Sequence, residues 1–236
     1  MKIKILLSFI CALVFTGAVA QTGPVWTQTM NTLPDSSYLF PVSAKSDYYG
    51  NVFVVSSELG QSSTIGKIHL YKYSPSGNLL WTQIFDNGGV NVPRAFDTAI
   101  DTAGNIYIAG GLMTTSEPLI LKYSNSGMLI WQTNTISAIG NDWLTQIICS
   151  NGNLYVQGST GLAMIDLNGA ELWSQSMLVN RIAVDNLGRM IASVFTSYQC
   201  IVRYNPDGSI NFQDSSNVAI KIAIDQNNNI TTLSGT

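Results

Sequence analysis

Short stretches of alternating hydrophobic and polar residues, separated by polar turns, fill most of the chain. The pattern is clearest in one unit, where the expected strands are Ala95–Ile100, Asn105–Gly110, Pro118–Tyr123 and Met128–Thr133. β-Branched and aromatic residues are frequent in these stretches, and no segment keeps a 3.6-residue period over three turns. The pattern predicts an all-β protein of short strands.

Two landmarks recur along the chain. The first is a glycine followed four residues later by a large aromatic residue: Gly77 and Trp81, Gly127 and Trp131, Gly169 and Trp173, Gly208 and Phe212. Successive glycines lie 50, 42 and 39 residues apart. The second is a polar turn before an alternating strand, beginning at Asp47, Asp101, Ser150, Asp185 and Asp225. Units of this length with four strands each are typical of propeller blades.

The repeat predicts a β-propeller of four-stranded antiparallel blades, with four full blades and a partial fifth. The expected blades cover residues 38–86, 95–135, 144–177, 180–214 and, in part, 217–236. Residues 24–30 match the last strand of a blade, because Val25-Trp26-Thr27-Gln28 repeats Leu80-Trp81-Thr82-Gln83. The fifth unit supplies only two strands, so we expect this chain to be a fragment of a longer protein.

The repeated residues have structural roles in this interpretation. We expect the aromatic residues to pack between neighbouring blades and the glycines to adopt positive φ in tight turns. The aspartates that open the turns are expected to accept backbone N–H bonds as Asx turns.

Parts of the repeat resemble known families. Residues 101–111 (DTAGNIYIAGG) and 70–85 (LYKYSPSGNLLWTQIF) resemble the bacterial β-propeller repeat family called SBBP, and residues 152–173 (GNLYVQGSTGLAMIDLNGAELW) are similar to the PQQ-like propeller repeat. The resemblance covers residues 24–236 and implies a propeller fold. It implies little about chemistry, because propellers carry many unrelated functions.

The first 20 residues have the features of an export signal. Lys2 and Lys4 precede an apolar run from Ile5 to Phe15, and Ala18-Val19-Ala20 forms a small-x-small cleavage site. The apolar run is shorter than the roughly 20 residues that span a bilayer, so we expect no membrane insertion of the mature chain. The prediction is an exported protein that is periplasmic, cell-surface or extracellular.

Charge and chemistry narrow the function classes. Only 11% of residues are charged, and without the predicted signal nine Lys and Arg face 14 Asp and Glu, a formal charge of −5. An acidic chain lacks the positive surface charge that binds the phosphates of nucleic acid. His69 is the single histidine, and no phosphate-binding, zincin or nucleophile-elbow motif occurs. We expect no catalytic residues, no metal and no cofactor. A bridge between Cys149 and Cys200, and a carboxylate pair of Asp97 and Asp142, both stay open.

Two features define a candidate ligand-binding surface. The middle turn of each blade and the links between blades vary in length, whereas the other two turns keep their form, so variation gathers at one end of the blades. Four residues before each first turn lies a ring of chemically different residues that is expected at the mouth of the central channel: Ser43, Asp97, Gln146, Arg181 and Lys221. Trp143, in a link between blades, is a further aromatic candidate on the variable face.

The leading hypothesis is an exported, non-catalytic propeller that acts as a binding or scaffold module in a larger secreted or cell-surface bacterial protein. Its partner would be a protein, a peptide or a glycan. One alternative is a propeller enzyme of the PQQ-dependent dehydrogenase type, for which the resemblance implies a cofactor on an aromatic platform with calcium ligands. The other is a purely structural spacer that binds no ligand.

Overall fold

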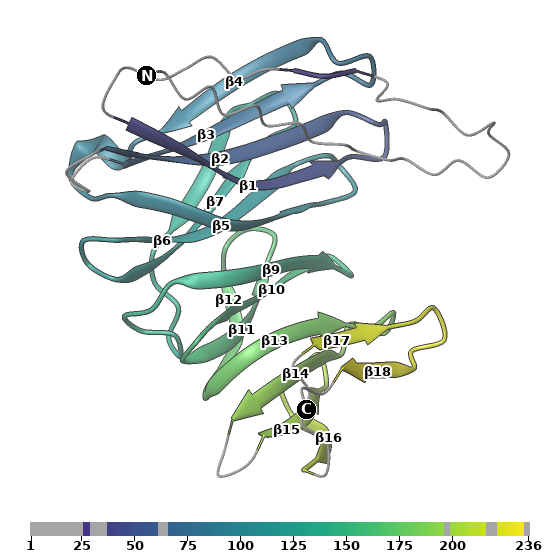
Figure 1. The fold of residues 1–236 in the computed structure, drawn as a ribbon. Coiled ribbons are helices and arrows are strands. Elements are labelled where there is room, and N and C mark those ends of the chain that lie inside the picture. The colour runs from purple at the N-terminus through teal and green to yellow at the C-terminus, as the bar shows by residue number, and fades with distance from the viewer. Residues whose placement is uncertain (1–25, 29–36, 61–65, 196–198, 216–220, 234–236) are drawn as a thin grey trace, which may run out of the picture.

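The structure is a computed structural model that describes residues 26–28, 37–60, 66–195, 199–215 and 221–233. The predicted signal, residues 1–20, lies outside these residues. Apart from one 3-10 turn at Asn87–Gly89, the regular secondary structure of the described residues is β-strand, which confirms the all-β prediction (Figure 1).

Four four-stranded antiparallel sheets and one two-stranded sheet follow each other along the chain, each with its strands in chain order. Blade 1 contains β1 (Ser37–Ser46), β2 (Val52–Gly60), β3 (Gly66–Tyr73) and β4 (Leu79–Phe85). Blade 2 contains β5 (Pro93–Ile100), β6 (Ile106–Leu112), β7 (Glu117–Tyr123) and β8 (Leu129–Thr133). Blade 3 contains β9 (Leu144–Ser150), β10 (Asn153–Gly158), β11 (Gly161–Asp166) and β12 (Glu171–Ser176). Blade 4 contains β13 (Leu178–Val184), β14 (Met190–Phe195), β15 (Gln199–Tyr204) and β16 (Ile210–Asp214), and β17 (Lys221–Ile224) pairs with β18 (Ile230–Leu233) in the partial blade 5.

The first strand of each blade, namely β1, β5, β9, β13 and β17, lies on the inner side of the arc that the blades form. β5 contacts β1 and β9, and β13 contacts β9 and β17, so these strands are neighbours across blade boundaries. In Figure 1, β1 is on the lower side of blade 1 and β13 on the upper side of blade 4, so the two first strands face each other across the arc. Four blades and a partial fifth, as predicted, are therefore arranged in the manner of a propeller.

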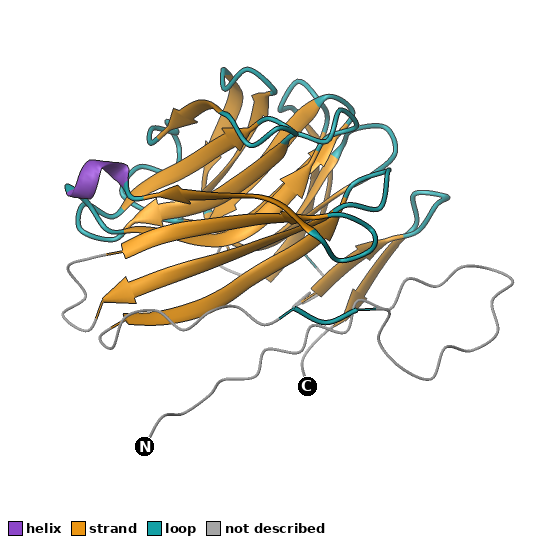
Figure 2. Cartoon of the chain, turned by 90° about the horizontal axis from the view of Figure 1, so that it is seen from above, coloured by secondary structure: helices purple, strands orange, loops and turns teal. Residues whose placement is uncertain are grey.

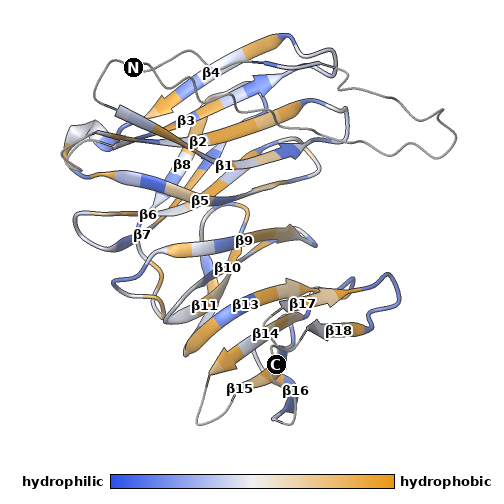
Figure 3. Cartoon of the chain, viewed as in Figure 1, coloured by the Kyte–Doolittle hydropathy of each residue, from blue (hydrophilic) through white to orange (hydrophobic). Residues whose placement is uncertain are grey.

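Each full blade is apolar on the faces that meet another described blade. In blade 2, Ile106 and Ile108 pack against blade 1, whereas Tyr107 and Ala109, which alternate with them, pack against blade 3. Alternate residues of a strand point to opposite faces, so a strand buried on both faces becomes hydrophobic throughout. In Figure 3 the first strands β5 and β9, in contrast, carry hydrophilic segments.

A tryptophan links each of blades 1 to 3 to the blade that follows it. The indole N–H donates to a carbonyl in the third turn of the following blade, as in Trp81 to Asn125 at 3.1 Å and Trp173 to Pro206 at 2.9 Å. The ring also covers the glycine of that turn: a Cβ at Gly208, where φ is +81°, would lie 2.9 Å from the Trp173 ring. The glycine is required twice, by its backbone conformation and by the space that the ring takes.

Trp26 makes the same contacts on blade 1. Its indole N–H donates to the Pro75 carbonyl at 3.1 Å, and the Gln28 amide donates to the Gly77 carbonyl at 2.8 Å. The segment 24–30 was expected to form a strand of the last-strand type. Its described part, residues 26–28, has no strand pairing but places Trp26 where a preceding blade would place its tryptophan.

The first turns are Asx turns, as predicted, at Asp47, Asp101, Asp185 and Asp225. In Asp101, Oδ1 accepts from the backbone N–H of Ala103 and of Asn105, both at 2.9 Å. Figure 2 shows such turns as loops at the ends of the strands. Cys149 and Cys200 are free thiols. Cys149 packs in the core between blades 2 and 3 and Cys200 in that between blades 3 and 4.

Candidate ligand-binding surface

The predicted ring positions coincide with a structural feature of the first strands. Ser43, Asp97, Gln146 and Arg181 each directly follow a β-bulge, whose extra residue is Val42, Phe96, Thr145 or Asn180. Lys221 begins β17 and pairs with Leu233 without a bulge, and its side chain lies outside the described part of the structure. A β-bulge re-aims the side chains beside it. The four bulges therefore show that these sequence positions are equivalent.

Three of the ring side chains bond to the next blade. Thr98 Oγ1 donates to Ser43 Oγ at 2.7 Å, and the Ile147 N–H donates to Asp97 Oδ2 at 3.0 Å. Gln146 makes two bonds to Ile182, donating to its carbonyl at 2.9 Å and accepting from its N–H at 3.0 Å.

In every case the partner is the residue that follows the ring residue of the next blade. A first strand is an edge strand with unpaired backbone groups on one side. Asp97 and Gln146 satisfy such groups in the neighbouring blade, a role that the sequence did not reveal. Arg181 is exposed. Among the ring residues whose side chains are described, it is the one turned toward solvent.

A second row of residues lies three positions before the ring and forms a continuous stack. Phe40, Arg94 and Trp143 occupy equivalent positions in blades 1, 2 and 3. The Arg94 guanidinium lies 5.8 Å from the centroid of Phe40 and 5.1 Å from that of Phe96, the bulge residue of β5. Phe96 in turn stacks on Trp143, with centroids 5.8 Å apart and ring planes 13° apart.

Tyr38 extends the stack at its other end, 6.5 Å from Phe40. We call these five residues, Tyr38, Phe40, Arg94, Phe96 and Trp143, the inner aromatic stack. Tyr38 is 56% exposed and Phe40 41% exposed. At the equivalent position of blade 4, Leu178 is also 57% exposed. The inner strands therefore present an apolar, solvent-accessible surface that crosses blade boundaries.

Two consecutive glycines of β6 make room for the stack. A Cβ at Gly110 would lie 2.9 Å from the carbonyl carbon of Arg94, and a Cβ at Gly111 would lie 2.7 Å from Cγ of Trp143. Gly110 thus lets the β5 backbone approach closely, and Gly111 seats the indole ring. These two close approaches explain why the sequence DTAGNIYIAGG ends in a pair of glycines.

Asp142 holds the loop that carries Trp143. Its Oδ2 accepts from Ser159 Oγ at 2.8 Å, from the Thr160 N–H at 2.9 Å and from Thr160 Oγ1 at 3.1 Å, and its Oδ1 accepts from the Trp143 N–H at 2.9 Å. Asp97 and Asp142, considered above as a carboxylate pair, are therefore engaged by different donors. The Trp143 indole N–H is buried and has no hydrogen-bond partner among the described residues.

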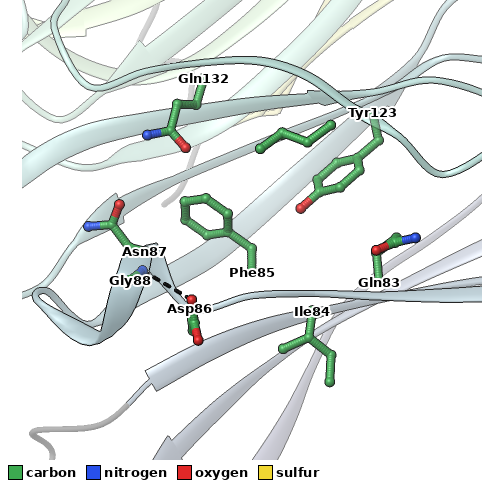
Figure 4. Close-up of a pocket in the computed structure, with 9 residues that line it drawn as sticks. Gln83, Ile84, Phe85, Asp86, Asn87, Gly88, Tyr123 and Gln132 are labelled. Atoms are coloured by element: carbon green, nitrogen blue, oxygen red, sulfur yellow. Dashed lines mark hydrogen bonds between the residues drawn. The ribbon is translucent and has the colours of Figure 1, made fainter.

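A separate pocket of about 320 Å³ lies on the outer side of blades 1 and 2, where the link after β4 begins (Figure 4). Its buried apolar part comes from Phe85 and Tyr123, and burial raises the pKa of Tyr123 to about 12. The remaining lining residues are Gln83, Ile84, Asp86, Asn87, Gly88, Leu129 and Gln132. Because it is built from outer strands, this pocket is distinct from the inner aromatic stack.

Blade 1 carries a buried polar pair on its outward face. His69 Nε2 lies 2.7 Å from Glu58 Oε2, and Tyr71 Oη lies 3.4 Å from His69 Nδ1. Burial alone would raise the pKa of the Glu58 carboxyl, but hydrogen bonds from His69 and Ser37 and the charge of His69 outweigh it and place that pKa below its usual value of 4.5. The corresponding faces of blades 2 to 4 are apolar.

No group of three or more His, Cys, Asp or Glu side chains in the described part of the chain is arranged to hold a metal ion. Within the same residues, no helix is long and apolar enough to cross a membrane. One face of the Trp143 indole is covered by Phe96 and the ring rests on Gly111, so the indole has at most one face for a stacked planar group.

Comparison with solved structures finds proteins that share the fold of this chain. A Bacteroides caccae protein of unknown function aligns over 85% of this chain and 68% of its own, with 18% identity and a TM-score of 0.51. PorZ, an essential surface component of the type IX secretion system of Porphyromonas gingivalis, aligns over 77% of this chain and 24% of its own, with 14% identity and a TM-score of 0.53. The β-propeller domain of the trilobed protease from Pyrococcus furiosus aligns over 76% of this chain and 57% of its own, with 9% identity and a TM-score of 0.48.

At these identities the similarity concerns the fold alone. The chain spans about two thirds of the first protein and less of the other two. No protein-family model matches the chain, and no curated protein is significantly similar to it. The class that the fold defines is a β-propeller with four-stranded blades.

Proposed function

We propose that this chain is an exported, non-catalytic ligand-binding module of a larger secreted or cell-surface bacterial protein. The observation that carries the proposal is the inner aromatic stack. Side chains of three blades meet there, two of its rings are more than two-fifths exposed, and its residues lie on the strands that face the centre of the arc. Exposed apolar surface of this kind on a folded domain commonly marks a binding site.

The carboxylates nearest the stack support binding rather than chemistry. Asp97 accepts the Ile147 N–H, and Asp142 accepts four hydrogen bonds that hold its loop. A general acid or base has to exchange a proton with a bound substrate, whereas these two groups are already committed to backbone and hydroxyl donors. His69 and Glu58 pair with each other on the outward face of blade 1.

Export is supported by the basic start, the apolar run and the cleavage-type sequence of the first 20 residues. The fold similarity to PorZ, a bacterial surface component, is compatible with the same location.

The proposal is tested on an array of glycans and peptides probed with the full mature chain, Phe40→Ala and Phe212→Ala. Phe212 is the matched control, because it is a similarly exposed phenylalanine beside an arginine, but on the outer strand β16. We expect at least one class of ligand to bind the unchanged chain and Phe212→Ala but not Phe40→Ala. Circular dichroism melting curves verify that the variants are folded.

Absence of any ligand on the array would favour the spacer alternative. Equal binding by Phe40→Ala would move the site away from the inner aromatic stack. Either result would contradict the proposal.

A further inference from the structure

The first strands differ in charge from the rest of the chain. The whole sequence has 11 Lys and Arg against 14 Asp and Glu, yet the five first strands hold four cationic residues and a single acidic one. The cationic residues are Lys45, Arg94, Arg181 and Lys221, and the acidic one is Asp97, which is bonded to blade 3. The inner strands of an acidic protein thus hold three more cationic than acidic residues, and a surface of one sign favours a ligand of the opposite sign.

Arg94 is the cation best placed to recognise such a ligand. Its guanidinium carbon lies within about 6 Å of the ring centroids of both Phe40 and Phe96, so two aromatic rings attract the cation. No hydrogen bond or ion pair links this guanidinium to another side chain or carbonyl in the described residues. Its five N–H donors are therefore available, and a planar guanidinium matches a carboxylate through two parallel hydrogen bonds.

We propose that the inner aromatic stack binds an acidic glycan, with Arg94 bonding the carboxylate of a uronate residue. This inference rests on the proposed binding function and names its ligand class. The apolar face of a sugar ring packs on an exposed aromatic ring, and Tyr38 and Phe40 offer such rings beside the guanidinium.

A polymer fits better than a single sugar. Arg94 lies in blade 2 and the exposed Arg181 in blade 4, so cations recur along the arc of first strands. A chain that repeats a carboxylate on each sugar ring can meet both. A peptide can carry several carboxylates on Asp and Glu, but it has no sugar ring whose apolar face packs on an aromatic ring.

The probe is tetragalacturonate, and its methyl ester is the neutral counterpart with the same sugar rings. Titration calorimetry at low salt compares the unchanged full mature chain with Arg94→Gln, Arg94→Lys and Arg203→Gln. Arg203 is the matched control, since its guanidinium also lies over a phenylalanine, 5.7 Å from the Phe212 centroid, but on the outer side of blade 4.

We expect tetragalacturonate to bind the unchanged chain and Arg203→Gln equally, and Arg94→Gln at least about tenfold more weakly, as the loss of a charge-assisted pair implies. Arg94→Lys keeps the charge without the fork and should fall between them. Affinity should also decrease with added salt, and the methyl ester should bind at least about tenfold more weakly than the acid.

Equal binding of the ester and the acid would overturn the inference, as would an Arg94→Gln variant of unchanged affinity. Tighter binding of a short peptide with a free C-terminal carboxylate would replace the glycan by a peptide and also overturn it. If neutral glycans bind and depend on Phe40 but not on Arg94, the inference fails while the proposed function stands. If nothing binds at all, both fail.

Discussion

Gln146 tests whether the ring side chains hold neighbouring blades together. In the structure its amide satisfies both backbone groups of Ile182, a residue that is 2% exposed. Gln146→Ala would leave a donor and an acceptor unpaired at the boundary between blades 3 and 4. Each unpaired buried polar group costs about 1–3 kcal/mol.

Gln146 itself is half-buried, so water can reach part of the site and the lower end of that range applies. We expect Gln146→Ala to lower the free energy of unfolding by about 2–3 kcal/mol. For a domain of this size that shift lowers Tm by about 4–12 °C.

The assay is equilibrium unfolding in urea, followed by tryptophan fluorescence, with Gln132→Ala as the control. Gln132 is an exposed glutamine whose side chain makes no hydrogen bond to the described residues, so the same chemical change should cost less than about 0.5 kcal/mol. The reasoning is refuted if the two variants unfold at the same urea concentration. An unchanged m-value for both is needed to assign the difference to stability.

Three further predictions concern stability and reactivity. Gly208→Ala should destabilise the protein by about 2–4 kcal/mol and Gly152→Ala by about 1–2, because both have positive φ but only the first meets a tryptophan ring; equal losses in thermal melts would remove the steric part of the explanation. Because the pKa of Glu58 is lower in the folded chain, the Glu58–His69 pair stabilises the fold above pH 4.5 and loses this effect as pH falls through the folded pKa. Glu58→Gln should therefore flatten the pH dependence of the urea midpoint below pH 4.5. The same pH dependence in the variant and the unchanged chain would contradict this. Burial raises the pKa of Cys149 to about 11, so iodoacetamide at pH 8 should leave it unmodified until urea unfolds the chain, as peptide mass mapping would show; rapid labelling of the folded chain would contradict this.

The fold could be predicted because the same turn and contact residues recur in each repeat unit. A glycine at positive φ, four residues before a tryptophan, serves both a turn and the seat for the tryptophan of the preceding blade, so the pair must recur in each unit. The strands expected in the second unit agree with β5 to β8 within two residues. Strands buried on both faces, such as β6 and β7, stand out as short apolar runs between turn residues.

The candidate surface was predicted only in part. The ring positions were found because they lie four residues before each first turn and differ in chemistry from blade to blade, and Trp143 because it is a large aromatic residue in a link. That Asp97 and Gln146 satisfy backbone groups of the next blade depends on contacts between blades, which no single repeat unit shows.

The rest of the stack was missed for a related reason. Phe40 and Arg94 lie three residues before ring positions, so aligning that position across blades would have indicated a second row. Phe96 could not be placed in this way, because it is the extra residue of a β-bulge and its direction follows from the local break in strand register.

The central claim, that ligand binds on the inner strands, is tested most directly by hydroxyl-radical footprinting of the full mature chain with and without saturating tetragalacturonate. The exposed rings at Tyr38, Phe40 and Phe212 and the outer-pocket residues Ile84 and Leu129 serve as reporters, since all are oxidised readily when accessible. We predict that the ligand protects Tyr38 and Phe40 and leaves Phe212, Ile84 and Leu129 unchanged. Protection of Ile84 and Leu129, with Tyr38 and Phe40 still oxidised as in the free chain, would place the ligand in the outer pocket and contradict the claim.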